Sequence, residues 1–330
     1  MAVPYGSDKN GLICGFLFTG DAPGTAVDLK RACEWLAGNE RGFVWLHFNL
    51  SDIQAETWMK ANLEAAPEFF EALHESSRST RIEDAHEALV AVVNDVAFEF
   101  AFDPAQIETL WVCAGPRLAV TARVHALRSI DRLRQHVKDG ERFDSSVAFL
   151  NHLLHDQGEV LAHIVRDATL QVDSIEDSLL RGRLQRKRVE LGSLRRVLVR
   201  LQRLLAPEPG ALFRLLRLPP RWIAAHDLEE LRQSTEEFSL NIRDCHELQE
   251  RIKLLQEEIA AQLGEQTNRN LFTLTVVTVL ALPINIVAGL LGMNVGGIPL
   301  AQDPHGFHVI VGFIVGFTVV AAWLAFRKRD

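Results

Sequence analysis

The sequence lacks the patterns of a catalytic or disulfide-rich protein. Its four cysteines, at positions 14, 33, 113 and 245, are scattered, and none forms a CxxC pair. This does not indicate a zinc ribbon or a disulfide framework and fits reduced thiols facing a cytosol. The chain also has no P-loop, GxSxG or HExxH pattern, so we expect no enzymatic activity and no ATP-driven work from this chain alone. The first residues carry neither a basic nor an apolar segment, so we expect no signal peptide.

Charged residues are missing from two segments near the end of the sequence. Neither 271–291 nor 307–326 contains Asp, Glu, Lys or Arg, and each is long enough to cross a bilayer as a helix. The loop between them, 292–306, lacks Lys and Arg, whereas Arg269 precedes the first span and the tail 327–330 is basic. The positive-inside rule therefore predicts a multi-pass protein in membrane lipid with both termini cytoplasmic and the loop on the outer, periplasmic side.

The remainder of the chain is predicted to be soluble and acidic, with a net charge of −8. This charge argues against nucleic acid as a partner. Residues 1–145 alternate apolar strand patterns with helical patterns, which predicts a cytoplasmic α/β domain. We expect strands at 12–18, 43–50, 89–93 and 96–100, a hairpin over 110–121, and helices near 28–37, 52–62 and 66–75. Asp52 is the expected N-cap of the second helix.

From about residue 126 the pattern is helical. We expect a helical hairpin over 146–223, interrupted at Pro207 and again at Pro219, and then a stalk helix over 224–270. Five stalk residues recur every seven positions: Leu231, Phe238, Cys245, Ile252 and Ile259. This spacing is typical of a packed helical stripe. The pattern predicts one helix from about 224 to 291 that enters the membrane. Such a helix needs the earlier helices, or other copies of itself, to cover its stripe.

Two membrane helices cannot enclose a water-filled path, so transport would require several copies around an axis. The first span is the better candidate for pore lining. Six of its residues fall at spacings of three or four, which places them on one helix face: Leu271, Leu274, Thr278, Leu282, Asn285 and Gly289. An amide in mid-membrane is costly unless it faces water or a partner. The alternative is that Thr and Asn only hold helices together. Leu271 and Leu274 are candidates for a constriction that gates by dewetting.

Gly292-Met293-Asn294 at the end of the first span resembles the signature of the CorA metal-transporter superfamily. The continuation 295–299 and the approach 265–271 resemble the zinc-transporting ZntB branch, and Ile298-Pro299-Leu300 stands where magnesium-transporting members usually carry Met-Pro-Glu. The resemblance implies a homopentamer with a funnel-shaped cytoplasmic domain. It also implies an outer selectivity ring in which Asn294 contacts a hydrated ion. The implied activity is zinc transport across the bacterial inner membrane, coupled to protons and directed inward.

Other residues are weaker candidates for ion attraction. Asp303, His305 and His308 lie near the predicted outer mouth, where they would concentrate cations, bind zinc or carry protons. Their alternative role is an exposed polar loop. Glu257 is the stalk carboxylate chosen for a first test, although a solvated helix face is the alternative. Cys245 and His246 point about 100° apart on a helix and are not expected to share an ion.

Two other functions stay open at this stage. One is a CorA-type magnesium or cobalt channel. The other is a membrane-anchored cation sensor. No cofactor is expected beyond the transported zinc or another divalent cation. Proton coupling stays a hypothesis, because neither span holds a carboxylate that would carry protons.

Overall fold

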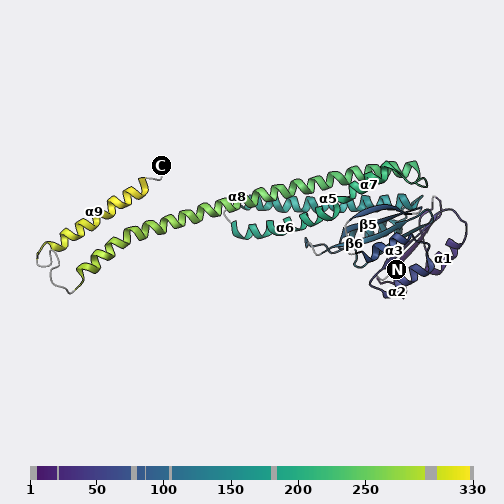
Figure 1. Ribbon diagram of the computed structural model, residues 1–330, viewed down its shortest axis with the longest axis horizontal. Coiled ribbons are helices and arrows are strands. Elements are labelled where there is room, and N and C mark those ends of the chain that lie inside the picture. Colours follow the sequence, from purple (N-terminus) through teal and green to yellow (C-terminus); the bar gives the residue numbers. More distant parts are fainter. Residues whose placement is uncertain are drawn as a thin grey trace. The chain divides into compact units, whose positions relative to one another are not determined.

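The computed structural model describes residues 6–20, 22–75, 80–85, 87–103, 106–179, 184–293 and 303–327. The chain divides into two compact units, Met1–Gln256 and Glu257–Asp330. The elements in chain order are β1 (Leu12–Phe18), β2 (Thr25–Ala26), α1 (Leu29–Ala37), β3 (Phe43–Asn49), α2 (Ile53–Asn62), α3 (Pro67–His74), β4 (Arg81–Ala85), β5 (Ala88–Val96), β6 (Ile107–Ala114), β7 (Leu118–Arg123), α4 (Arg128–Lys138), α5 (Ser146–Leu179), α6 (Leu184–Leu205), α7 (Pro207–Arg217), α8 (Ala225–Leu291) and α9 (Gly306–Arg327) (Figure 1).

The first unit contains a seven-stranded mixed sheet in the order β2-β1-β3-β7-β6-β5-β4. Strands β3 and β7 pair in parallel, with Trp45 opposite Ala119, and the other described pairs are antiparallel. Successive side chains of a strand point to opposite faces of a sheet. Accordingly Trp45 on β3 joins one buried cluster, whereas its neighbours Val44 and Leu46 join another. The sheet is therefore covered on both faces.

Different helices cover the two faces. One cluster contains residues of α1, α2 and α3, such as Trp35, Met59 and Phe69. The other contains residues of α4, α5 and α7, such as Leu133 and Phe149, and includes Leu231 near the start of α8. The expected α/β class of the N-terminal region is confirmed, as a three-layer α/β/α arrangement.

Most of the predicted elements are present. Asp52 caps α2, with its carboxylate accepting the Gln54 N–H at 3.0 Å. The predicted strand at 96–100 is wrong, because β5 is one continuous strand that ends at Val96. Strand β4 was not predicted. Gly42, which precedes β3, has a φ of +121°, and an added Cβ would lie 2.0 Å from the Phe18 carbonyl oxygen. Only glycine fits this turn.

A buried polar cluster joins the end of β5 to α5 and α7. Asp95 accepts the backbone N–H groups of Val96 and Ser129 at 2.7 Å each. The Gln157 amide donates to the Asn94 carbonyl at 2.7 Å and to Glu208 at 3.2 Å. Glu208, in the first turn of α7, is fully buried. Burial raises the pKa of Glu208 to about 8, with the nearby Asp95 contributing, and burial also raises the pKa of Asp95 to about 6.

The region predicted as a helical hairpin contains α5, α6 and α7, and α7 starts at Pro207 with proline in its first turn. Helix α8 continues through Pro283 to Leu291, so the single long helix is confirmed. All five residues of the heptad stripe are buried.

Within the first unit the stripe packs on the chain's own helices. The Gln249 amide donates to the Leu198 carbonyl of α6 at 3.1 Å. The Phe238 ring lies beside Gly158 of α5, where an added Cβ would meet it at 3.6 Å. Arg251 pairs with Asp173 at 2.7 Å and also with Glu176, both on α5. Intramolecular packing therefore covers this part of the stripe.

Candidate functional site

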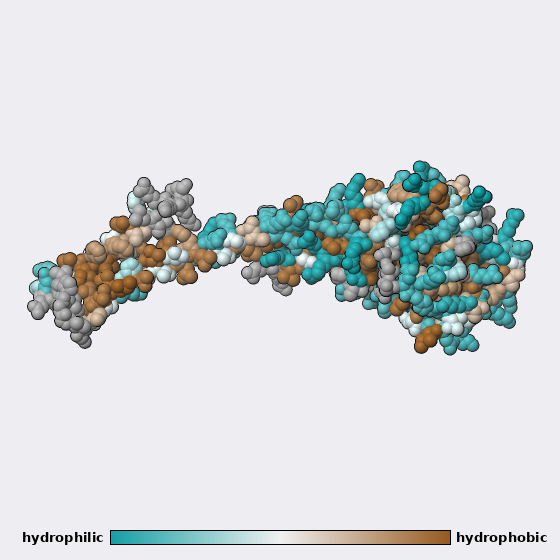
Figure 2. All heavy atoms as spheres, viewed as in Figure 1, coloured by the Kyte–Doolittle hydropathy of each residue, from teal (hydrophilic) through white to brown (hydrophobic). Residues whose placement is uncertain are grey.

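The second unit holds the two apolar helical segments. The end of α8 and residues Gly306–Trp323 of α9 are long and apolar enough to cross a membrane. Figure 2 shows apolar residues concentrated in these segments. Their side chains are not covered by the chain itself: Leu274 is 63% exposed and Leu290 60% exposed. Large contiguous apolar surface of this kind marks contact with lipid or with other protein.

The six predicted pore-lining residues lie on one face of α8. Residues Leu271–Leu291 are helical throughout, so positions 271, 274, 278, 282, 285 and 289 fall within an arc of about 80° at 100° per residue. All six are exposed in the described chain. The structure therefore places Thr278, Asn285 and Gly289 on the same helix face as three leucines. The position of this face beside a pore stays a prediction.

The polar residues of this span differ in how they are satisfied. The hydroxyls of Thr273, Thr275 and Thr278 each donate to the carbonyl four residues earlier, at 2.8–2.9 Å. These hydroxyl protons therefore need no partner outside the helix. Among the described residues, no hydrogen bond to the Asn285 amide is present. Asn285 is thus the group of this span that most needs water or a neighbouring chain.

The glycine of the Gly-Met-Asn tripeptide ends the helix. The Gly292 N–H donates to the Ala288 carbonyl at 2.9 Å, and a Cβ at position 292 would come within 3.1 Å of that carbonyl oxygen. Glycine therefore allows the chain to turn closely at the end of α8. Met293 is half exposed. Asn294, the expected selectivity residue, and the segment 295–302 lie outside the described residues, as does the basic tail from Lys328.

The residues predicted for cation attraction are all exposed. Asp303 accepts the His305 N–H at 2.8 Å, and its carboxylate lies 3.9 Å from the His305 ring. His308 lies in the first turn of α9, edge-on to the Phe307 ring. Glu257 is exposed on α8. These positions are open to an ion, and their geometry also fits an exposed polar surface.

A comparison with protein-family models identifies the family of this chain. A model of the family described as CorA-like Mg2+ transporter protein matches residues 40–328. This chain belongs to that family. The expected superfamily is therefore confirmed. Family membership also agrees with the absence of a recognisable catalytic or ATPase motif in the sequence.

Several relatives share nearly the whole chain with this CorA-like protein. The divalent cation transporter CmaX of Pseudomonas aeruginosa is 27% identical, with 97% of each chain covered. The zinc transport protein ZntB of Yersinia pseudotuberculosis is 24% identical over 86% of this chain and 87% of its own. The full-length CmaX structure matches with a TM-score of 0.80 at 25% identity over 98% of both chains. The CorA magnesium transporter of Methanocaldococcus jannaschii shares the fold, with a TM-score of 0.77 at 18% identity over 96% of this chain and 98% of its own.

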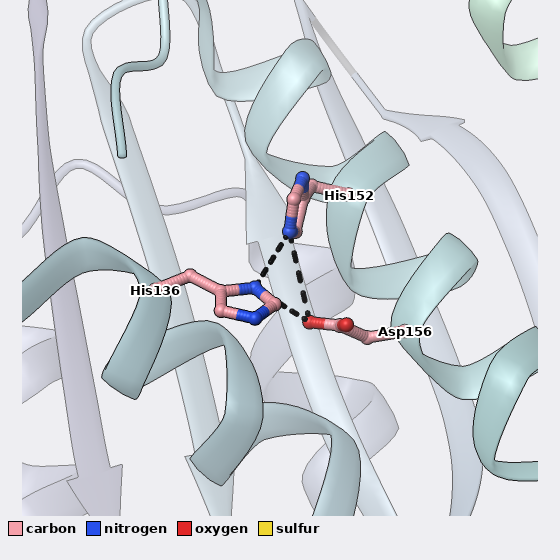
Figure 3. Close-up of side chains that lie close together, drawn as sticks. All are labelled: His136, His152 and Asp156. Carbon is pink, nitrogen blue, oxygen red and sulfur yellow. Dashed lines mark hydrogen bonds and ion pairs between the residues drawn. The ribbon is translucent and has the colours of Figure 1, made fainter. Parts of the chain in front are cut away.

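Sequence reasoning missed a histidine–carboxylate group in the first unit of this CorA-like chain. His136 of α4 meets His152 and Asp156 of α5 (Figure 3). From the sequence, only the pairing of His152 with Asp156 could have been predicted, because these two residues are one helical turn apart. His136 comes from another helix. Cys245 and His246 contact different residues, in agreement with the expectation that they do not share an ion. The Cys245 thiol is buried near Leu198, and the exposed His246 contacts Gln202.

Proposed function

We propose that this chain is one subunit of an oligomeric transporter that carries a divalent cation, principally zinc, across the bacterial inner membrane. The observation that carries the proposal is the single face of α8 that combines Thr278, Asn285 and Gly289 with leucines in a chain of the CorA-like family. One such face per subunit, repeated around an axis, would line a narrow path.

The assembly we propose is a homopentamer with a funnel-shaped cytoplasmic part, as the family resemblance implies. The exposed apolar side chains of α8 and α9 support burial against lipid and neighbouring copies. The basic residues at the ends of the spans favour cytoplasmic termini, with the 292–306 loop outside.

Selectivity in this proposal resides in uncharged groups. Neither span carries a charged side chain, so the ion would cross with much of its hydration shell, contacting amide and carbonyl oxygens. Asn294 would form the outer ring, and Asp303, His305 and His308 would raise the cation concentration at the mouth. Glu257 would attract ions on the cytoplasmic side. Leu271 and Leu274 would form the apolar gate.

A second candidate function differs from the first in the ion that is transported. Sequence relatives named as zinc transport proteins support zinc. The family description and a structural neighbour named as a magnesium transporter support a magnesium or cobalt channel instead. Uptake coupled to protons belongs to the zinc proposal, although the spans offer no carboxylate as a proton carrier.

The deciding experiment is zinc flux into proteoliposomes that hold the purified chain, with and without an inward proton gradient at fixed voltage and with magnesium as competitor. Asn294→Ala is the test variant. Thr318→Ala, which removes a hydroxyl bonded within α9 at 2.8 Å, is the control. Zinc uptake that rises with the gradient and fails only in Asn294→Ala supports the proposal. Flux that favours magnesium and ignores the gradient supports the channel, and no flux of either ion supports a membrane-anchored sensor.

A further inference from the structure

The three side chains of the histidine–carboxylate group point toward one another (Figure 3). His136 lies in the last turn of α4, and His152 and Asp156 lie one turn apart on α5. The His136 Nδ1 atom is 2.9 Å from His152 Nε2 and 3.7 Å from Asp156 Oδ2. His152 Nε2 is 3.8 Å from the same carboxylate oxygen. The three potential ligand atoms therefore form one closed triangle.

The size of this triangle suits a small metal ion. The point in its plane equidistant from all three atoms lies about 2.0 Å from each, as the circumradius for sides of 2.9, 3.7 and 3.8 Å gives. Zinc binds imidazole nitrogen and carboxylate oxygen at about 2.0–2.2 Å. Ideal tetrahedral ligands at that distance are about 3.3 Å apart, so each edge would change by about half an ångström or less.

A second observation points to a missing partner. Asp156 is 1% exposed, and its Oδ2 atom accepts no hydrogen bond from the described residues. Its contacts to the two rings, at 3.7 and 3.8 Å, exceed hydrogen-bond length. Burial raises the pKa of Asp156 and lowers the pKa of His152. A buried carboxylate oxygen without a hydrogen bond is costly, and a bound cation would relieve that cost.

Solvent can reach the group from one side. His152 lines a pocket of about 670 Å³ in the first unit, whose lining also includes one basic residue, Arg142, and the acidic residues Glu141, Asp144, Asp227, Glu230 and Glu237. The pocket's acidic lining would concentrate cations there. Arg132 opposes this, because its Nε atom lies 3.8 Å from Asp156 Oδ1, but the same guanidinium bonds Glu159 at 2.6 Å.

A second histidine–carboxylate group on the same pocket offers less support for a metal site. His226, Asp227 and Glu230 also lie within ligand range of one another. However, Asp227 already accepts the Ser145 hydroxyl at 2.7 Å, and Glu230 accepts the Asn151 amide at 3.2 Å. The His136 group is therefore the better site.

We propose that His136, His152 and Asp156 bind a borderline transition-metal ion, with Zn2+ as the representative, and that a water from the pocket completes its coordination. The two imidazoles set the class of ion, because magnesium prefers an all-oxygen octahedron. In the bound form each ring carries its proton on the nitrogen that faces away from the ion. This site lies outside the membrane spans and is independent of the route that an ion takes through them.

The test is calorimetric titration of the purified full-length chain with Zn2+ in millimolar magnesium. The variants are His152→Ala and Asp156→Asn, with His155→Asn as the matched control because His155 lines the same pocket but is outside the triangle. We expect the test variants to lose one zinc per chain or at least tenfold in affinity, since even second-shell changes cost about 10–100-fold. The control keeps the site.

Thermal unfolding in the presence of a chelator checks that each variant is folded. Asp156→Asn should keep its metal-free stability, since it only neutralises a poorly partnered buried charge, and should lose the zinc-induced rise in melting temperature. The inference is overturned if zinc binds both test variants as tightly as the parent chain, or if magnesium displaces the ion. Zinc flux through the spans, tested with Asn294→Ala, is a separate readout, so either proposal can fail alone.

Discussion

The buried carboxylate of Glu208 should make the stability of the first unit fall as the pH rises. In the folded chain its pKa is about 8, against 4.5 for an ordinary glutamate. Between these values the folded state holds a proton that the unfolded state has released. A proton held only by the folded state means that unfolding becomes easier with each step in pH. The contribution is neutral below about pH 4.5 and is most unfavourable above pH 8.

The magnitude follows from the size of the shift. One pKa unit corresponds to about 1.4 kcal/mol, and pH 7 lies about 2.5 units above the ordinary pKa of 4.5, so at pH 7 the native state is disfavoured by about 3 kcal/mol relative to a chain with a permanently neutral group there. Glu208→Gln supplies such a group and keeps an acceptor for the Gln157 amide, now bonded at 3.2 Å. We therefore expect the variant to be more stable than the parent by about 3 kcal/mol at pH 7 and by less than about 1 kcal/mol at pH 5.

Urea unfolding followed by tryptophan fluorescence measures this difference, because five of the six tryptophans lie in the first unit. Glu71→Gln, which neutralises an exposed carboxylate on α3, is the control. The reasoning is refuted if parent and Glu208→Gln show parallel stability profiles between about pH 5 and pH 8. Asp95, with its pKa raised to about 6, adds a smaller slope of the same sign in both proteins.

Three further outcomes are expected. Phe238→Ala should destabilise the first unit by about 3–5 kcal/mol through the cavity left beside Gly158, whereas Leu240→Ala, at a 49% exposed position on the same helix, should cost under about 1 kcal/mol in the same urea assay. Gly42→Ala should yield little folded protein in an expression and solubility assay, because its Cβ would collide with the Phe18 carbonyl. Asn285→Leu should keep oligomerisation, measured by size-exclusion chromatography with light scattering, yet lower zinc flux in proteoliposomes at least tenfold; unchanged flux would mean that Asn285 only holds helices together.

Periodicity predicted the elements whose burial follows a simple rule. The seven-residue stripe of α8 was found because one repeated face of that helix is buried, whereas β1 and β3 were found as continuous apolar runs because both faces of these strands are buried. Strand β5 was predicted as two strands, 89–93 and 96–100, which leave out the polar residues Asn94 and Asp95. In the fold both residues are buried within β5. The Asn94 amide donates to the Thr80 hydroxyl at 2.9 Å, and the Asp95 carboxylate accepts the Ser129 N–H. Tertiary hydrogen bonds, which local sequence does not encode, reversed the expected assignment.

The candidate sites divide in the same way. The stripe of α8 that we propose as pore lining is local to one helix, and its residues were grouped from spacing alone. The His136 group needs α4 packed on α5, which brings together residues 16 positions apart at 2.9 Å. No spacing rule gives that pairing. The arrangement of copies around an axis depends on surfaces between chains, so a single sequence leaves it as a proposal.

The two apolar spans also determine how the protein responds to an electric field. No Asp, Glu, Lys or Arg lies within 271–291 or 307–326. Helices without fixed charge can tilt, rotate or slide while moving no charge through the bilayer. A voltage of 100 mV would then act on a crossing divalent ion with about 4.6 kcal/mol, twice the value for one elementary charge, and on these helices with almost nothing. If the proposed pore opens by moving these helices, their Asp-, Glu-, Lys- and Arg-free segments would contribute little gating current, and its voltage dependence would come mainly from the ion.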